Sequence, residues 1–176
     1  MSYKNQQRTT SADTSVNVVN RIYTNYNFLK GSRILDYGGG KYNSNVDYMK
    51  EKGCNVLVYD PFNRSESHNQ TVIDAVCKQG VDYIVCSNVL NVIDNDSDLH
   101  YAIQQMAKLS KISTSFGHNG LLLVTVYEGD SKYRNIGRET SKGYQRNMLT
   151  RAYLPYLEPY FRIVSIKNKI IVCEVL

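Results

Sequence analysis

The sequence predicts a doubly wound α/β fold with a mostly parallel sheet and an antiparallel hairpin at its C-terminal end. Short apolar segments alternate with segments of helical periodicity, which is typical of strand–helix–strand units. A run of glycines, Gly38 to Gly40, follows the first apolar segment, as in sheets that bind nucleotides where a strand turns into a helix. Two apolar segments around Lys167 and Asn168 close the chain and indicate the hairpin.

The elements follow in order from these patterns. Strands are expected at residues 33–37, 55–60, 81–88, 121–127, 161–167 and 169–176. Helices are expected at residues 14–29, 43–52, 65–78, 96–111 and 148–159. Residues 1–13 are polar, with nothing to bury, and are expected to form a disordered tail. Residues 14–176 are then a single domain, a size that can enclose one core.

Two segments depart from a regular strand–helix alternation. Between Asp60 and Val81 there is room for one crossover helix, so we expect the strand–helix pair that usually follows the second strand to be missing. Residues 128–147 are rich in Gly, Lys, Arg and Ser, have no clear period, and are expected to form a long loop. Such a loop is a lid, a nucleic-acid contact or a mobile segment.

Composition narrows the class of protein. The 176 residues carry a net charge of +5, which permits an anionic partner such as nucleic acid without requiring one. No apolar run approaches the ~20 residues of a membrane span, and the N-terminus lacks the apolar core of a signal peptide, so we expect a cytoplasmic protein. The four cysteines form no CxxC or Cys/His cluster, which favours buried free thiols over a metal site.

The glycine turn and Asp60 together indicate a ligand that contains ribose. Glycines at positions 38 and 40 allow positive φ and a close backbone approach to a ligand. Asp60 ends the second strand about 20 residues after Gly40, which is the spacing at which such sheets place a carboxylate on ribose hydroxyls. The alternatives are a plain tight turn and a loop-starting Asp before Pro61.

Over residues 16–176 the chain resembles class I S-adenosylmethionine-dependent methyltransferases, whose sheet is Rossmann-like. The residues that carry this resemblance are Asp36-Tyr37-Gly38-Gly39-Gly40, Asp60 and Cys86-Ser87-Asn88-Val89-Leu90-Asn91. More narrowly, it resembles small methyltransferases of phages and bacteria through Asp60-Pro61-Phe62-Asn63, Asn88-Val89-Leu90-Asn91-Val92-Ile93, Tyr127-Glu128-Gly129-Asp130 and Tyr144-Gln145-Arg146-Asn147. A phage protein would work in the host cytoplasm. Tyr42 departs from the family pattern, which often has a glycine there.

The resemblance implies roles for named residues. The methyl donor would contact Asp36, Gly38, Gly40, Tyr42, Asp60, Phe62 and Ser87. Candidates for catalysis are Asn88, Glu128 and Tyr127, and candidates for substrate contacts are Asn91, Tyr144, Gln145 and Asn147. Each also has a structural alternative: the acids as turn caps, the amides as caps, Phe62 as core, and Glu128 as a solvated loop acid.

The function expected from the resemblance is methyl transfer from S-adenosylmethionine to an unidentified acceptor, with no metal. Charge favours a nucleic acid or nucleotide over a small metabolite. An Asp/Asn-Pro-Pro-Tyr/Phe motif and a Pro-Cys nucleophile are both absent after the third strand, which weakens DNA-base methylation. The alternatives are a non-catalytic module that binds the donor and a nucleotide-linked oxidoreductase. Asn43 at the last position of an incomplete GxGxxG weighs against the oxidoreductase.

Overall fold

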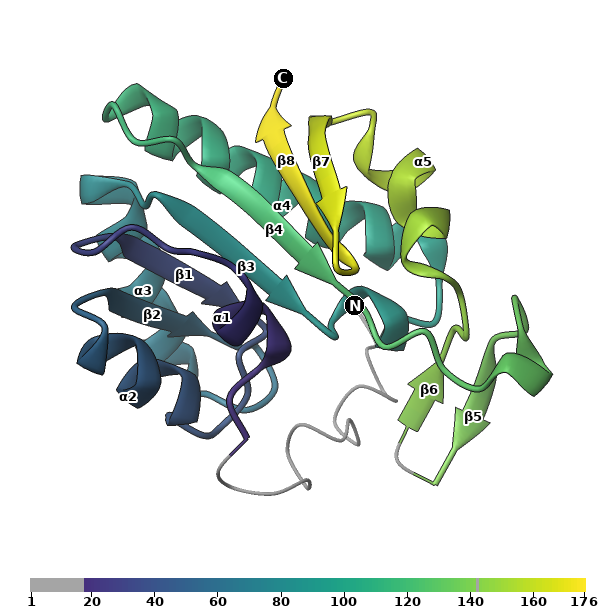
Figure 1. Cartoon of the computed structure of the whole chain (residues 1–176). Helices are drawn as coiled ribbons and strands as arrows, with labels where there is room; N and C mark the ends of the chain where they lie inside the picture. The colour runs from purple at the N-terminus through teal and green to yellow at the C-terminus, as the bar shows by residue number, and fades with distance from the viewer. Residues whose placement is uncertain (1–17, 142) are drawn as a thin grey trace.

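The computed structural model describes residues 18–141 and 143–176, so the expected tail at residues 1–13 lies outside the described residues. Six strands form one sheet in the order β2-β1-β3-β4-β8-β7 (Figure 1). The strands are β1 Arg33–Tyr37, β2 Asn55–Tyr59, β3 Tyr83–Ser87, β4 Leu121–Thr125, β7 Phe161–Lys167 and β8 Ile170–Val175. The helices are α1 Arg21–Asn25, α2 Ser44–Glu51, α3 Glu66–Gln79, α4 Asp96–Ser115 and α5 Leu154–Leu157.

The pairing of the strands confirms the predicted sheet. Strands β1 to β4 are parallel, whereas β8 pairs antiparallel with β4 and with β7. The hairpin turn between β7 and β8 uses Asn168 and Lys169, with φ of 52° and 61°. Positive φ at both turn residues matches the right-handed twist of the two strands. The fold is therefore a Rossmann-like sheet with a C-terminal antiparallel hairpin.

The shortened connection after β2 is also confirmed. The stretch from β2 to β3 is described in full and holds one helix, α3, and β2 is an edge strand beside β1. The carbonyl of Tyr59 accepts from the Gly38 amide at 2.7 Å and so faces β1. The carbonyl of Val58 therefore faces the open edge, where the imidazole Nε2 of His68 lies 2.8 Å from it. The side chain of His68 stands where a further strand would otherwise pair.

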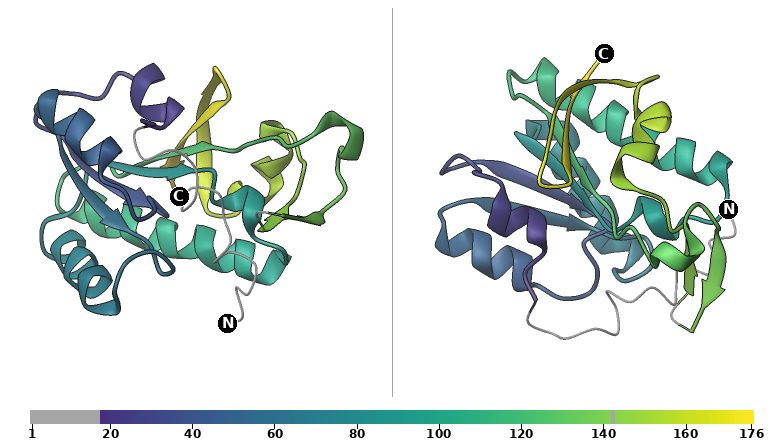
Figure 2. Two further views of the ribbon diagram at one scale, coloured as in Figure 1. Left: turned by 90° about the horizontal axis from the view of Figure 1, so that it is seen from below. Right: turned by 45° about the vertical axis from the view of Figure 1, so that its right-hand side comes forward.

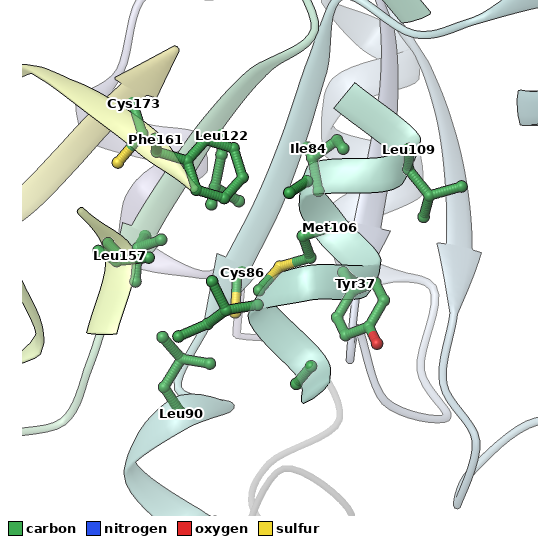
Figure 3. Close-up of a cluster of buried hydrophobic side chains, with 14 of the residues drawn as sticks. Tyr37, Ile84, Cys86, Leu90, Met106, Leu109, Leu122, Leu157, Phe161 and Cys173 are labelled. Atoms are coloured by element: carbon green, nitrogen blue, oxygen red, sulfur yellow. The ribbon is translucent and has the colours of Figure 1, made fainter. Parts of the chain in front are cut away.

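Helices cover both faces of the sheet (Figure 2). Because side chains alternate along a strand, Ile34 packs on the face covered by α1 and α2. Leu35 and Tyr37 pack on the other face, against the apolar sides of α3 and α4 (Figure 3). Asp36 lies on the α1/α2 face, where it contacts Asn45 of α2. This alternation brings one acid to the end of a strand that is otherwise apolar.

The first helix is shorter than the expected 14–29, whose first residues lie outside the described part. Helix α1 ends at Asn25, and Tyr26 has extended backbone angles. The rings of Tyr26 and Phe28 then pack edge-to-face on Tyr83 of β3, with centroids 5.7 Å and 5.1 Å away. Burial of these two aromatic rings against the sheet outweighs continuation of the helix.

The expected long loop is wrong in one respect, because it contains regular structure. Within residues 128–147, which we call the arm, a 3₁₀ turn (Ser131–Tyr133) precedes a hairpin of β5 (Arg138–Thr140) and β6 (Gly143–Gln145). The small sheet lies beyond the arrowheads of the main strands (Figure 1). Strands of three residues are too short to show a period of two in the sequence.

Two helix predictions also need correction. Helix α4 runs to Ser115 rather than residue 111, because the hydroxyls of Ser110 and Ser113 bond to the carbonyls of Gly120 and Leu109 and let polar residues face the core. The helix predicted at 148–159 is a 3₁₀ turn, Thr150–Tyr153, followed by α5. Pro155 stands in the first turn of α5, where its missing N–H costs nothing.

The four cysteines are free, and Cys54, Cys86 and Cys173 are buried. Burial raises the pKa of the Cys86 thiol far above its usual value and that of Cys173 to about 12, so neither is a reactive thiolate. Within residues 18–141 and 143–176, no helix is long and apolar enough to cross a membrane. The same residues bring together no group of three or more His, Cys, Asp or Glu that could hold a metal ion.

Candidate functional site

The candidate site begins at the glycine turn that follows β1. Gly38 and Gly40 have φ of 80° and 76°, a conformation that side chains with a Cβ rarely adopt. A Cβ added at Gly38 would lie 2.4 Å from Cγ2 of Val89, so the turn packs directly against the segment after β3. Since β1 lies between β2 and β3, this place is the switch point of the sheet, where the strand order reverses.

Asp36 supplies a buried carboxylate beneath this turn. The residue is 1% exposed, and its Oδ2 accepts from Nδ2 of Asn45 at 3.0 Å. Its Oδ1 has no hydrogen-bond partner among the described residues. The hydroxyl of Tyr23, also buried and without another partner among the described residues, acts on Asp36 as a hydrogen-bond donor that lowers its pKa. Burial raises this pKa from 3.8 to about 6, although Asn45 and Tyr23 oppose the rise.

Asp60 holds the loop after β2 to the glycine turn. Its Oδ2 accepts from the amide of Gly40 at 2.8 Å, and its Oδ1 accepts from the amides of Phe62 and Asn63 at 2.9 Å each. The side-chain amide of Asn63 reaches both oxygens at 3.2 Å. The carboxylate is 4% exposed and already has protein donors on each oxygen.

Arg64 completes this connection, and sequence reasoning did not identify it. Its Nε donates to the carbonyl of Gly40 at 2.8 Å, while Nη2 donates to the carbonyl of Tyr42 at 3.1 Å and to Oδ1 of Asn43 at 2.8 Å. The peptide groups of Gly40 are thus held by an acid on the N–H side and a guanidinium on the C=O side. A cation four residues after the strand-end acid is the signal that was available in the sequence.

The carboxyl end of β3 contributes two of the predicted residues. Ser87 is buried, whereas Asn88 is exposed and has φ of 59°. The backbone amide of Asn88 donates to the carbonyl of Thr125 at 2.9 Å. A left-handed asparagine at the switch point is an uncommon conformation and keeps Asn88 a candidate for substrate contact.

The model of the protein family described as "Methyltransferase domain" matches residues 15–168 of this sequence. The chain belongs to this family. The glycine turn, Asp36 and Asp60 therefore lie in a methyltransferase domain, which confirms the predicted family.

Other comparisons add little to this assignment. One similar solved structure is a Rhodobacter sphaeroides protein named as a Zn-dependent alcohol dehydrogenase, with 13% identity and a TM-score of 0.38. The match covers 80% of the methyltransferase chain, which spans 54% of the length of that protein. This likeness is too low to bear on function. No protein of curated function matches the sequence.

The arm of the methyltransferase domain is fixed by polar residues that the sequence suggested as substrate contacts. Nδ2 of Asn91 donates to Oε1 of Gln145 at 3.1 Å, and Nε2 of Gln145 donates to the carbonyl of Tyr127 at 3.0 Å. Asn91 and Gln145 are 2% and 9% exposed. Tyr144, half-buried, places its hydroxyl against Gly137, where an added Cβ would lie 1.8 Å away. The geometry gives Asn91 and Gln145 an anchoring role.

Asn147 fastens the other side of the arm. Its Oδ1 accepts from the amide of Asp130 at 3.1 Å, and its Nδ2 donates to the carbonyl of Ile136 at 2.8 Å. A Cβ at Gly129 would lie 2.0 Å from the same Oδ1. Asn147 is 1% exposed, so in this conformation its amide serves the arm itself.

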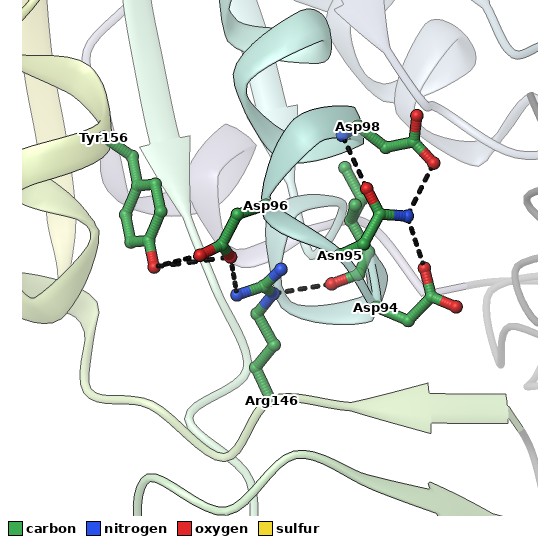
Figure 4. Close-up of polar contacts among 7 residues, drawn as sticks. Asp94, Asn95, Asp96, Asp98, Arg146 and Tyr156 are labelled. Carbon is green, nitrogen blue, oxygen red and sulfur yellow. Dashed lines mark hydrogen bonds and ion pairs between the residues drawn. The ribbon is translucent and has the colours of Figure 1, made fainter.

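Arg146, between these anchors, is a buried cation that sequence reasoning missed. Its Nε donates to the carbonyl of Ile93 at 2.5 Å, and its Nη1 pairs with Oδ1 of Asp96 at 2.8 Å (Figure 4). The hydroxyl of Tyr156 reaches the same carboxylate at 3.4 Å. Because Asp96 starts α4, this ion pair ties the arm to that helix.

Tyr127 and Glu128, two of the candidates for catalysis, lie where the arm begins. Hydrogen bonds and an ion pair hold Glu128 in place. Its Oε1 accepts from the amide and hydroxyl of Thr150 at 3.0 Å and 2.9 Å, and its Oε2 pairs with Nζ of Lys169 at 2.6 Å. The bonds from Lys169 and Thr150 lower the pKa of Glu128 to about 2, which suits a fastening residue better than a base near neutral pH. Tyr127 is 61% exposed.

Proposed function

We propose that the domain binds S-adenosylmethionine over the carboxyl ends of β1 and β2 and transfers its methyl group to a nucleic acid or nucleotide. The observation that carries the proposal is the turn of Gly38 and Gly40 at the switch point of a methyltransferase domain, with the buried carboxylate of Asp36 beneath it and that of Asp60 bonded to it. The negative charge of Asp36 so close to the turn favours a ligand cation such as an ammonium there.

The residues present fit this donor in most respects. Gly38 and Gly40 have the positive φ of such a turn, and the negative charge of Asp36 beneath it suits an ammonium. Tyr42 and Phe62 are half-buried beside the turn and could cover the adenine, and Ser87 lies at the end of β3. Asp60 fits less simply, because protein donors already occupy its carboxylate.

When bound, S-adenosylmethionine supplies a methyl group that is already activated on a sulfonium. The domain then has to position the acceptor and exclude water, so geometry supplies most of the rate. In the proposal, Asn88 lies where the acceptor meets the donor. Tyr127, which is exposed, and Tyr144, which is half-buried, are the aromatic side chains proposed to contact the acceptor. Glu128 fastens the start of the arm rather than removing a proton.

A nucleic acid or nucleotide as acceptor is supported by the surface of the arm. Ile136 of the arm and Tyr127, which directly precedes the arm, are 56% and 61% exposed, and the guanidinium of Arg138 lies 3.8 Å from the ring centre of Tyr133. Exposed aromatic rings combined with cations suit bases and phosphates. The net charge of +5 acts in the same direction.

A non-catalytic donor-binding module is the second candidate, and the tethering of Glu128 favours it. Transfer of labelled methyl groups to host RNA, host DNA and small-molecule pools distinguishes the two. Label in a nucleic-acid or nucleotide pool supports the proposed acceptor. Donor binding without incorporation into any pool would favour the module.

Isothermal titration calorimetry with S-adenosylmethionine, S-adenosylhomocysteine and NAD tests the donor itself. We expect both sulfur ligands to bind and NAD not to bind, because the negative charge of Asp36 favours an amino-acid ammonium, which NAD lacks. Binding of NAD without either sulfur ligand would overturn the proposal.

The affinity for S-adenosylhomocysteine should depend on pH through Asp36. The pKa of Asp36 is about 6 in the free protein, and pairing with an ammonium requires the ionised form. The ligand lowers this pKa, so affinity rises with pH up to about 7 and then levels off; between pH 7 and pH 5 the loss is about tenfold. Calorimetry at pH 5, 6 and 7 measures it.

The control for this pH dependence is Asp36→Asn, which should bind more weakly and show little change over the same interval. The other groups near Asp36 are Tyr23, Asn45, Asp60 and Arg64. A wild-type affinity that stays constant from pH 5 to pH 7 would contradict an ionic role for Asp36.

A further inference from the structure

We infer that the side-chain amide of Asn63 acts as a gate on Asp60, occupying the carboxylate until a hydroxyl of a ribose displaces it. The inference rests on the proposed function, because it concerns how a ribose-containing donor reaches its acid. It adds a residue whose side chain opposes binding and makes the loop after β2 selective for a ligand with a ribose hydroxyl.

The gate is supported first by the number of hydrogen-bond donors around the carboxylate of Asp60. A carboxylate has about four lone-pair sites. Three backbone amides occupy Asp60, those of Gly40, Phe62 and Asn63, at 2.8 to 2.9 Å. The side chain of Asn63 adds two further contacts, one to each oxygen. The acid therefore has no remaining site for a diol in this conformation.

The donors around Asp60 differ in how easily they can leave the carboxylate. The amides of Phe62 and Asn63 belong to the turn that Asp60 starts, and the amide of Gly40 belongs to a peptide held on its other side by Arg64. Displacing any of the three requires the backbone to move. The side-chain amide of Asn63 lies at 3.2 Å from each oxygen, farther than the backbone donors, and leaves by side-chain rotation.

A ribose hydroxyl can take the place that Asn63 leaves. Each hydroxyl donates one hydrogen bond, and the three backbone bonds leave one of the four lone-pair sites, on Oδ2, once Nδ2 of Asn63 has rotated away. One hydroxyl of the diol can therefore replace Nδ2 of Asn63 on Oδ2 without disturbing the three backbone bonds. Binding then loses the two contacts of Asn63, so their removal by mutation should increase affinity for a ligand with a diol.

The experiment compares wild type, Asn63→Ala and the control Asn43→Ala. Asn43 is a neighbouring exposed asparagine that accepts from Arg64 and makes no contact with Asp60. By calorimetry we expect Asn63→Ala to bind S-adenosylhomocysteine about 3-fold to 10-fold more tightly than wild type, which corresponds to the net strength of one ordinary hydrogen bond. Asn43→Ala should not gain affinity. Equal or weaker binding by Asn63→Ala would overturn the gate.

Two ligands then separate the diol from the rest of the nucleoside. In NMR titrations, adenosine should show the gain in Asn63→Ala, whereas 2′,3′-dideoxyadenosine should bind wild type and variant equally. The same gain with both nucleosides would overturn the inference, because the diol would then not be what displaces Asn63.

A measurement on the wild-type protein keeps the inference testable if Asn63→Ala folds poorly. The side-chain ¹⁵N–¹H₂ signals of Asn63 should shift on addition of S-adenosylhomocysteine, and signals that stay unchanged at saturation would overturn the gate. Failure of the gate and failure of the proposed function give different results. If wild type and Asn63→Ala both fail to bind, the proposed function fails, whereas if wild type binds with an unmoved Asn63, only the gate fails.

Discussion

Asp60→Ala is expected to lower the free energy of unfolding by about 3–5 kcal/mol, because it leaves the amides of Gly40, Phe62 and Asn63 without their charged acceptor. The same change should abolish measurable binding of S-adenosylhomocysteine. Two independent losses contribute: the acid proposed to bind the ribose is gone, and the glycine turn no longer has a fixed N–H side. Urea denaturation followed by circular dichroism measures stability, and calorimetry below the unfolding transition measures binding.

Asp74→Ala is the matched control for this prediction. Asp74 is an exposed acid on α3 whose described contact is a hydrogen bond from Gln70. Its removal should change stability by no more than about 0.5 kcal/mol and leave binding intact. If Asp60→Ala unfolds at the same urea concentration as Asp74→Ala, the carboxylate does not hold the two loops together.

Gly38→Ala should show the second large effect. Alanine at φ of 80° adopts a left-handed conformation at a cost of about 1–2 kcal/mol. Its Cβ would also lie 2.4 Å from Cγ2 of Val89, so Val89 or the turn must shift, at a further cost of about 1–3 kcal/mol. A shift of the turn moves Gly38 and its neighbours away from the ligand. We therefore expect a loss of stability together with a strong loss of affinity for S-adenosylhomocysteine.

Gly31→Ala separates the two contributions. Gly31 has φ of 87°, and an added Cβ would meet nothing within 4 Å. It should therefore show the conformational cost alone, with unchanged ligand affinity. Thermal unfolding and calorimetry on both variants give the comparison. Equal behaviour of the two alanine variants would show that the close approach of Gly38 to Val89 is unimportant for the site.

Local patterns allowed the sheet and the glycine turn to be predicted. The alternation of apolar strands and amphipathic helices depends on burial along each segment, so the sequence predicted β1, β2, β3 and β4 within two residues or so at each end. The missing strand–helix pair follows from chain length alone. The positive φ of Gly38 and Gly40 is a property of the residue type that the turn requires.

The arm and the interior of the site could not be predicted in the same way. Gln145 and Asn147 have the character of exposed, polar loop residues, yet they are buried because Asn91, Tyr127 and Ile136 supply their hydrogen-bond partners. These partners lie up to 54 residues away in the chain. A single polar residue carries no signal of such a partner.

The sequence by itself therefore determined the order of strands and helices, the shortened sheet and the glycine turn with its two acids, because these depend on periodicity, chain length and backbone conformation. Only the tertiary structure decided what the acids do. It buried Asp36 beneath the turn, surrounded Asp60 with donors from its own loop and from Gly40, and added Arg64 to the turn. The physical reason is that hydrogen-bond satisfaction depends on which groups meet in space, and these groups meet only once β1 and β2 pair.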